Sequence, residues 1–393
     1  MRVLHLTTEF PPIIYGGLGT ALGGLVLASA ASGIEAGVLL IEDHPAGTYG
    51  ESAAGRGGPS PPLTNPADPH VPVLRTSWDQ ALRFALRMVR WWRPDVLHLH
   101  VFWLWAVAKL LQEHTGIPLV YTVHSLDVAE YELGNGPSQC LAQWHTQQAV
   151  LASADLIVAP SESERELISR YCPAVADRVR VAGHGIDDAP VTPRYQPEPG
   201  AGRAATVLYV GRFVDRKGIR ELLAAIPDVL NRAPLVRFVL SGGYRHTTAE
   251  QLASWWLPAV LRPACDRVGF TGWLPPEQLR EYYRLADILV VPSWYEPFGM
   301  VVLEGMLHGM AIAATRVGGL AEILEHERTG LLFQPRDAPA LTHSILRLVN
   351  DPDLRLRLGR AASDEVRRTW LWPSAMTRMH RIYTEATSAS NGC

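Results

Sequence analysis

Cysteine is scarce in this chain of 393 residues, and its scarcity argues against two classes of site. The four cysteines, Cys140, Cys172, Cys265 and Cys393, are scattered, and no two of them form a Cys-x-x-Cys pair. This spacing suits neither a structural zinc site nor a disulfide framework. It is typical of a reducing compartment, so we expect a cytoplasmic protein.

Long apolar runs and a strong charge imbalance are also missing. No uninterrupted apolar stretch is long enough to span a bilayer, and the N-terminus enters a predicted strand at residues 2–6 without a signal-peptide layout. We therefore expect no integral membrane segment. The formal charge of −3 predicts no nucleic-acid partner. With 47% hydrophobic residues, the chain has the composition of a soluble globular protein, and its length predicts two or three domains.

The most informative stretch of the sequence runs from Ser293 to Gly319. Apolar runs at 287–292 and 311–315 predict two buried strands, and the residues between them predict a helix that ends near Gly309. In such a strand–helix–strand unit, ligands bind at the carboxyl ends of the strands.

Two acids, Glu296 and Glu304, lie eight residues apart in this stretch. Because Pro297 suits the first turn of a helix, we expect Glu296 at the helix N-terminus, where the macrodipole favours an anion. Eight helical residues span roughly 12 Å, more than the carboxylate separation of about 5–9.5 Å in glycosidases. The acids therefore suit two ends of one long ligand, although two solvated glutamates would give the same pattern. Nearby glycines at 299 and 318–319 favour the interpretation as a ligand site, because they let a ligand approach backbone N–H groups.

A basic turn follows the predicted strand at 206–210. Arg212 and Lys217 lie in this turn together with Gly211 and Gly218. Two cations at a glycine-containing strand end fit a diphosphate, although an exposed basic turn would contain the same residues.

Histidines lie at the ends of two more predicted strands. His98 and His100 alternate in the strand at 95–100, so both fall on one face, and His124 follows the strand at 118–123. Two histidines without a third ligand are a weak indication of metal. A lone histidine is usually structural, but one at the carboxyl end of a strand in an α/β sheet faces the ligand crevice.

A glycine-rich loop containing Gly16, Gly17 and Gly19 precedes a predicted helix. Such a loop can bind an anion, and it can equally be a tight strand-to-helix turn. It is not a dinucleotide fingerprint, because Leu22 stands at the position of the third glycine.

Two other segments have simpler interpretations. Asp351 and Asp353 could be a metal motif, but their place before a predicted helix favours an N-cap. Residues 44–77 are rich in Pro, Gly and Ser and have no periodicity, so we expect a structureless loop. It could be an acceptor-side lid or a disordered insertion.

Together these motifs resemble those of retaining GT-B glycosyltransferases, in the large family of glycogen synthases and sucrose synthases (glycosyltransferase family 4 type). Glu296 and Glu304 match its Glu-x7-Glu signature, and residues 211–218 match its Gly-Arg-x4-Lys-Gly turn. The resemblance implies an α/β chain of two doubly wound Rossmann-like domains facing across a cleft. We expect an acceptor-side domain at 1–187 plus 372–393, and a nucleotide-sugar-binding domain at 188–371 that starts with a Pro/Gly-rich linker.

The resemblance also implies roles for individual residues. Arg212 and Lys217 would hold the donor phosphates, Glu304 the ribose, and Glu296 would lie near the sugar that His124 orients. The expected catalytic residues are Glu296, His124, Arg212 and Lys217. The expected donor-binding residues are Gly16, Gly17, Arg212, Lys217, Phe298, Gly299, Met300 and Glu304, with Tyr15, His100 and Trp103 on the acceptor side.

The implied reaction moves a glucose-type or N-acetylglucosamine-type sugar, with retention, from a nucleoside diphosphate to a hydroxyl of a small-molecule or saccharide acceptor. UDP is the favoured carrier, and we expect no cofactor or metal, because the cations replace it. A glucan synthase using ADP- or UDP-glucose, a sugar-nucleotide epimerase and a non-catalytic binding module remain alternatives. Tyr15 and Val101-Phe102 replace residues of the glycogen synthases and favour a different acceptor. The oligomeric state stays open, with a homo-oligomer among the alternatives.

Overall fold

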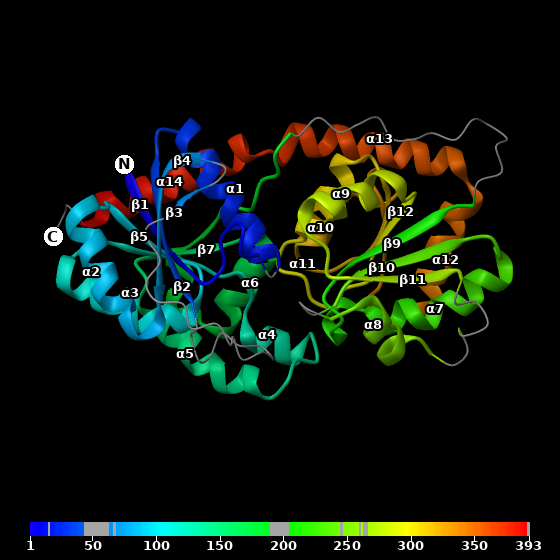
Figure 1. The fold of residues 1–393 in the computed structure, drawn as a ribbon, viewed down its shortest axis with the longest axis horizontal. Coiled ribbons are helices and arrows are strands. Elements are labelled where there is room, and N and C mark those ends of the chain that lie inside the picture. The colour runs from blue at the N-terminus through cyan, green and yellow to red at the C-terminus, as the bar shows by residue number, and fades with distance from the viewer. Residues whose placement is uncertain are drawn as a thin grey trace. The chain divides into compact units, whose positions relative to one another are not determined.

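The computed structural model describes residues 1–14, 16–42, 63–65, 68–188, 204–243, 247–258, 261 and 266–390. The chain divides into two compact units (Figure 1). The first comprises Met1–Ala129, Pro137–Gly185 and Trp372–Cys393, and the second comprises Glu130–Gly136 and Ile186–Leu371. A seven-residue segment from the first half of the sequence, Glu130–Gly136, therefore belongs to the second unit.

The first unit contains an eight-stranded sheet with the order β3-β4-β2-β1-β5-β6-β7-β8. Its strands are β1 (Arg2–Thr7), β2 (Glu35–Glu42), β3 (Leu63–Asn65), β4 (Asp68–Ser77), β5 (Val96–Leu99), β6 (Leu119–Thr122), β7 (Leu156–Ala159) and β8 (Val179–Val181). All neighbours run parallel except β3 and β4. The order reverses between β1 and β5, and such a reversal is where ligands bind in doubly wound sheets.

Helices pack against this sheet (Figure 1). The main contacts with its strands come from α1 (Gly17–Ala31), α2 (Ala81–Trp92), α3 (Trp105–Thr115), α6 (Glu162–Tyr171) and α14 (Trp372–Ser390). The other helical elements in this part of the chain are α5 (Gln139–Ser153), α4 (Asp127–Glu132), which runs into the segment Glu130–Gly136, and the short 3-10 turns η1 (Trp78–Gln80), η2 (Phe102–Leu104) and η3 (Pro173–Arg178). The last helix, α14, packs on α1, where a Cβ at Gly24 would lie 2.3 Å from the indole of Trp372. Only glycine allows this close approach.

The second unit contains a six-stranded parallel sheet with the order β11-β10-β9-β12-β13-β14. Its strands are β9 (Thr206–Gly211), β10 (Arg237–Gly242), β11 (Val268–Gly272), β12 (Ile288–Val291), β13 (Ala311–Thr315) and β14 (Leu331–Phe333). The helical elements are η4 (Asp215–Lys217), α7 (Ile219–Arg232), α8 (Ala249–Trp256), α9 (Pro276–Leu285), α10 (Met300–Leu307), α11 (Gly318–Ile323), α12 (Ala338–Asn350) and α13 (Pro352–Thr369). The strand order reverses between β9 and β12.

The prediction that residues 44–77 lack structure is wrong for the end of that segment. The strand β4 pairs in parallel with β2, so that Val73 lies beside Val38, and β3 pairs with β4 on its other edge. Val71 and Val73 are buried, as in an alternating half-buried strand. Neighbouring prolines concealed this alternation in the sequence. Residues 43–62 and 66–67 lie outside the described residues.

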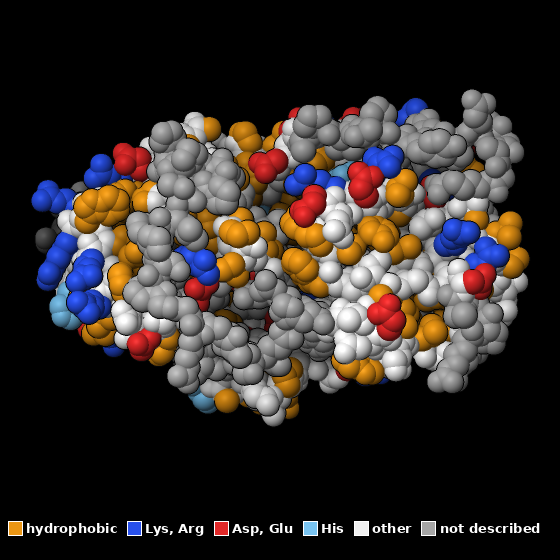
Figure 2. All heavy atoms as spheres, viewed as in Figure 1, with side chains coloured by type: hydrophobic (Ala, Val, Ile, Leu, Met, Phe, Trp, Pro, Cys, Tyr) orange, Lys and Arg blue, Asp and Glu red, His pale blue; other side chains and the backbone are white. Residues whose placement is uncertain are grey.

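The prediction that Asp351 caps a helix is confirmed. The carboxylate of Asp351 accepts the N–H of Leu354 at 2.8 Å, so this aspartate caps α13 as expected. Cys140 is buried within α5, and Cys172 follows α6 and is partly exposed. Within the described chain, every helix is too short or too polar to cross a bilayer. The amphipathic helix α2 exposes arginines, and Figure 2 shows Lys and Arg side chains gathered at the end of the first unit that carries it.

Candidate active site

Two loops of the second unit meet where its strand order reverses. One follows β9 and carries Lys217, and the other follows β12 and carries Glu296. The backbone N–H of Trp294 donates to the carbonyl of Arg216 at 2.7 Å, which joins the loops. Gly218 also holds them together, because its φ is +67° and a Cβ there would lie 1.9 Å from the carbonyl oxygen of Pro292.

Replacing Gly218 with alanine is therefore expected to force the loops apart. The strained backbone and the clash should together cost roughly 2–4 kcal/mol of unfolding free energy. Activity should fall at least about tenfold, because a shift of about 1 Å at a catalytic group has large effects. Urea unfolding and steady-state kinetics measure both. Gly116→Ala is the matched control, since Gly116 has a φ of +68° but open space around its Cβ. Equal effects from both variants would show that the contact with Pro292 is unimportant.

Lys217 and Glu296 form an ion pair between these loops. The lysine Nζ lies 2.5 Å from Oε2 of Glu296, and the two side chains are only 19% and 11% exposed. The hydroxyl of Ser293 donates to the same oxygen at 3.1 Å. Burial alone would raise the pKa of Glu296, but the charges of Lys217 and Arg216 and these hydrogen bonds bring it below its usual value. The carboxylate is therefore ionised at neutral pH.

Arg216 supplies a second buried cation that sequence reasoning did not single out. Its guanidinium lies 3.2 Å from the carboxylate of Glu130, which the segment Glu130–Gly136 carries into this unit. Asn135 of that segment also donates to Asp215 at 2.9 Å. Because Glu130 and Arg216 are far apart in sequence, no local pattern could have predicted this pair.

The helix α10 begins later than predicted. Its first residue is Met300 and its N-cap is Gly299, so Pro297 lies outside the helix and Glu296 lies four residues before it. The predicted axial separation of the two acids is therefore wrong, because the chain from 296 to 299 is not helical. The left-handed φ of +116° at Gly299 explains the late start, since it turns the chain into the helix.

The glycine pair after β13 has a packing role. The N–H of Gly319 donates to the carbonyl of Glu296 at 3.0 Å, and a Cβ at Gly318 would lie 2.1 Å from the same oxygen. This N–H therefore supports the Glu296 loop. The prediction that it faces a ligand is wrong, because the carbonyl of Glu296 already accepts this N–H.

Glu304 lies within α10 and contacts a neighbouring helix. Its Oε2 accepts the hydroxyl of Tyr283 at 2.5 Å, and the ring of Tyr283 stacks on His308. Burial raises the pKa of Glu304 to about 7, although the Tyr283 hydrogen bond and the charge of Arg280 act in the opposite direction. Tyr283 thus orients a carboxylate that is only partly ionised at neutral pH.

The remaining predicted donor-site residues lie in varied environments. Arg212 is exposed, and its carbonyl accepts the hydroxyl of Tyr209 at 2.9 Å. Phe298 is buried edge-on against Trp370, and Met300 is partly exposed at the start of α10. Gly16 and Gly17 lie at the start of α1, whereas Tyr15 lies outside the described residues.

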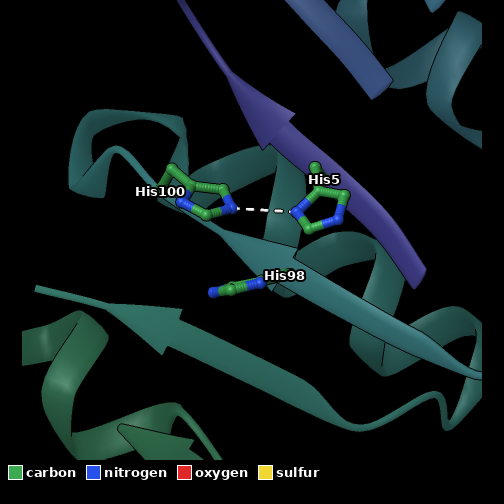
Figure 3. Close-up of side chains that lie close together, drawn as sticks. All are labelled: His5, His98 and His100. Carbon is green, nitrogen blue, oxygen red and sulfur yellow. Dashed lines mark hydrogen bonds between the residues drawn. The ribbon is translucent and has the colours of Figure 1, made fainter. Parts of the chain in front are cut away.

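A row of histidines lies where the strand order of the first unit reverses. His5 of β1 is paired in register with His98 of β5, and His100 and His124 follow β5 and β6. Nδ1 of His5 lies 3.0 Å from Nε2 of His100 (Figure 3), and Nδ1 of His100 lies 3.1 Å from Nε2 of His124. His98 and His100 share a face as predicted, with ring centroids 4.0 Å apart. Trp103 lies nearby in sequence on η2 and is partly exposed.

The three buried imidazoles of His5, His98 and His100 have ring nitrogens close enough to suggest a metal site. Five of their six ring nitrogens already have hydrogen-bond partners, however. His98 contacts the hydroxyls of Tyr383 and Thr122, both at 2.7 Å. A metal ion bound by one nitrogen of each ring would have to break at least two of these four hydrogen bonds, so we interpret the group as a hydrogen-bonded network.

Burial keeps these histidines neutral. It lowers the pKa of His5 and of His124 to about 3, and the pKa values of His98 and His100 fall well below the usual 6.5. Neighbouring histidines lower most of these values further, because two adjacent imidazoles cannot both be charged cheaply. His184 stacks on His124 with ring centroids 5.5 Å apart, and both are partly exposed.

Comparison with known proteins identifies the family. The family described as "Glycosyl transferase 4-like domain" matches residues 16–185, and "Glycosyl transferases group 1" matches residues 204–351. The alpha-maltose-1-phosphate synthase of Mycolicibacterium smegmatis is 31% identical over 99% of this chain and 100% of its own length. The chain belongs to this glycosyltransferase family.

A further relative agrees with this assignment, and a solved structure shows the same fold. The glycogen synthase of Mycobacterium tuberculosis is 28% identical to this glycosyltransferase over 98% of the chain and 95% of its own length. The structure of Anabaena HepE in complex with UDP and glucose covers 98% of this chain and 99% of its own, with a TM-score of 0.74 and 19% identity. The predicted GT-B fold is confirmed.

The structure of the glycosyltransferase adds residues that sequence reasoning missed. His5 contacts His100 and Tyr283 contacts Glu304, both of which were singled out, and the charge of Arg216 lowers the pKa of Glu296. Polar residues within or beside apolar stretches were the only available signal. Such residues are more often structural than functional, so the signal does not suffice.

Proposed function

We propose that this chain is a cytoplasmic, retaining hexosyltransferase that moves a glucose-type or N-acetylglucosamine-type sugar from UDP to a hydroxyl acceptor. The observation that carries the proposal is the buried Lys217–Glu296 pair at the strand-order reversal of the second unit. In doubly wound sheets this position binds nucleotides. The pair supplies a preorganised cation for the leaving diphosphate and a carboxylate for the reacting sugar.

Charge development explains how these residues act. As the bond from the anomeric carbon to the diphosphate breaks, the phosphate gains negative charge and the sugar becomes oxocarbenium-like. Lys217 and Arg212 stabilise the leaving diphosphate, and Glu296 stabilises the positive sugar. Glu304 accepts hydrogen bonds from the ribose hydroxyls, and His124 orients the sugar. On this proposal, residues 188–371 bind the nucleotide sugar, and residues 1–187 with 372–393 serve the acceptor.

The weak basicity of the proposed reacting residues supports the proposed retention of configuration. Inversion needs a general base with a pKa near the working pH to activate the acceptor. Glu296 is already paired with Lys217, and burial lowers the pKa of His124 to about 3, so neither is a strong base. The leaving phosphate oxygen instead takes the acceptor proton on the same face of the sugar. The anomeric configuration of the product, measured by NMR, tests this step, and an inverted product would refute it.

The names of the relatives support the proposed donor and acceptor. HepE has been solved with UDP and glucose, and the two enzyme relatives are named for glycogen and alpha-maltose-1-phosphate. The second of these names favours a small phosphorylated product. Because one relative is a glycogen synthase, the second candidate function is that of a glucan synthase. Assays with UDP- and ADP-glucose, each with a sugar phosphate or a glucan as acceptor, distinguish the two candidates.

The proposed cationic site predicts independence of metal ions. Incubation with EDTA is expected to leave the transfer rate within about twofold, because Lys217 and Arg212 perform the phosphate neutralisation that a metal supplies elsewhere. Rates with and without added Mg²⁺ measure this. Complete loss in EDTA that Mg²⁺ restores would contradict the cationic site.

Replacing each of the two glutamates should affect nucleotide binding differently. Glu304→Gln is expected to weaken binding of UDP roughly 10- to 100-fold, as for losing a hydrogen bond to a charged group, whereas Glu296→Gln should mainly lower kcat. Isothermal titration calorimetry with bare UDP measures the first effect, and steady-state kinetics the second.

A pH series provides the internal control for Glu304. Because the ribose hydroxyls favour the ionised carboxylate and its pKa is about 7, UDP affinity should fall as the pH drops below 7. The Glu304→Gln variant should lose that part of the pH dependence. If both variants lose UDP affinity equally, the two acids do not lie at opposite ends of the donor.

A further inference from the structure

A continuous chain of imidazoles connects the interior of the first unit to His124. Nδ1 of His5 faces Nε2 of His100, and Nδ1 of His100 faces Nε2 of His124. His5 and His100 are 0% and 3% exposed, whereas His124 is partly exposed. Figure 3 shows the buried end of this chain, with the ring nitrogens of His5 and His100 pointing toward each other.

Proton counting allows two arrangements of this chain. A neutral imidazole carries one N–H and one bare nitrogen, so His100 must donate with one nitrogen and accept with the other. If His5 donates from Nδ1, then His100 donates from its own Nδ1, and the proton of His124 lies on Nδ1. If the direction is reversed, His5 carries its proton on Nε2, and His124 donates from Nε2 to His100.

The buried end distinguishes these arrangements. Among the described residues, Nε2 of His5 has no hydrogen-bond partner. The reversed direction would place an N–H at this position, and orphaned buried N–H groups are rarer than orphaned acceptors. The favoured direction instead leaves a bare nitrogen there and places an N–H on each Nδ1 along the chain.

We propose that His5, acting through His100, fixes the tautomer of His124 with its proton on Nδ1, so that His124 acts as a hydrogen-bond donor to an oxygen of its ligand. His5 and His100 are then positioning residues, and they act on a histidine whose second nitrogen has no partner among the described residues. The identification of that oxygen as a sugar hydroxyl rests on the proposed function, whereas the tautomer does not.

The tautomer also restricts the ligand. An N–H at Nδ1 accepts no proton, so His124 cannot act as a general base through that nitrogen. It can hold a hydroxyl oxygen in one orientation, with that hydroxyl free to donate elsewhere. Isolated histidines in water favour the proton on Nε2, so the structure predicts a departure from the intrinsic preference.

Nitrogen NMR of the free protein tests the tautomer directly. Protein labelled with ¹⁵N-histidine gives distinct shifts for protonated and bare ring nitrogens, and single His→Gln variants assign the signals. The expected result at pH 7 is a protonated Nδ1 and a bare Nε2 in His124, and the same in His5. A protonated Nε2 in His124 would overturn the proposal, whether or not the protein transfers sugar.

Two variants of His5 test the coupling. His5→Phe keeps an aromatic ring but removes the hydrogen bond, so His124 should move toward the Nε2–H tautomer and kcat/KM should fall about 3- to 10-fold, as for one uncharged hydrogen bond. His5→Asn keeps an N–H near the position of Nδ1. It should restore both the Nδ1–H tautomer of His124 and kcat/KM. Tyr383→Phe is the matched control, because it removes a buried hydrogen bond to His98 at 2.7 Å, outside the chain of imidazoles. It should leave the tautomer of His124 unchanged.

The outcomes separate this proposal from the proposed function. A shifted tautomer in His5→Phe with unchanged kcat/KM supports the coupling and argues against a sugar contact at His124. An unchanged tautomer in His5→Phe overturns the coupling and leaves the proposed transfer reaction intact. If His5→Phe does not fold, the NMR of the unmodified protein and of His5→Asn still decides the tautomer.

Discussion

Replacing Lys217 with alanine is expected to reduce kcat by about 10²–10³, the loss typical of removing one preorganised donor from developing negative charge. It is also expected to lower the free energy of unfolding by about 3–5 kcal/mol, because Glu296 would remain buried without its partner. The chain contains only one other lysine, Lys109, and uses arginine at every other basic position. Steady-state kinetics at saturating donor and urea unfolding measure the two losses.

A double variant separates catalysis from stability. Lys217→Met combined with Glu296→Gln removes both charges of the pair, so stability should return to within about 1 kcal/mol of the unmodified protein. Activity should remain at least as low as in the single variant. Lys109→Ala removes a lysine that is 50% exposed and should change neither quantity. If Lys217→Ala keeps its activity within threefold, the phosphate role of Lys217 is wrong.

Acidification below pH 6.5 is expected to destabilise the first unit steeply. In the unfolded chain a histidine titrates near pH 6.5, whereas burial holds the pKa of His5 at about 3 and keeps His98 and His100 neutral well below 6.5. Folding stability from depressed histidine pKa values is complete above pH 6.5 and is lost as the pH falls. These three groups contribute about 3 kcal/mol to the loss between pH 6.5 and 5.5, and the depressed pKa values of His124 and His184 add to it. Urea unfolding at several pH values measures this slope.

Two variants control this acid effect. His5→Phe should reduce the loss by about 1 kcal/mol, whereas replacing the exposed His145 with glutamine should not change it. Glu304 has the opposite effect on the free energy of unfolding as the pH falls. Its pKa is raised to about 7, so it takes up a proton in the folded second unit before it would in the unfolded chain. The Glu304→Gln background removes that opposing effect. A loss below 1 kcal/mol in this background would refute the neutral buried cluster.

The sequence predicted elements whose residues are close together in the chain. Apolar runs such as 288–291 and 311–315 form strands because both faces of a parallel sheet are buried. Asp351 caps α13 through a residue three positions away. The family signature placed Lys217 and Glu296 in one site, and the structure brings their charged atoms within 2.5 Å.

Local reasoning failed where proline or glycine concealed the pattern. The strand β4 was missed because Pro69 and Pro72 interrupt an apolar alternation that a neighbouring strand nevertheless stabilises. The start of α10 was placed too early because Pro297 suits a first helical turn. Gly299, with its left-handed backbone, determines where the helix begins.

Contacts between distant residues were decided by the tertiary structure. His5 and His100 are 95 positions apart, Arg216 and Glu130 come from opposite halves of the sequence, and Gly218 owes its role to the carbonyl of Pro292. Each residue type is compatible with many environments, and only packing selects one. The sequence by itself determined the strands with uninterrupted apolar runs, the cap at Asp351 and the charged motifs, because these depend on neighbouring residues. The tertiary structure decided which charges are paired, which histidines are neutral and which atoms orient Glu304 and His124, because burial and distance arise only when the chain has folded.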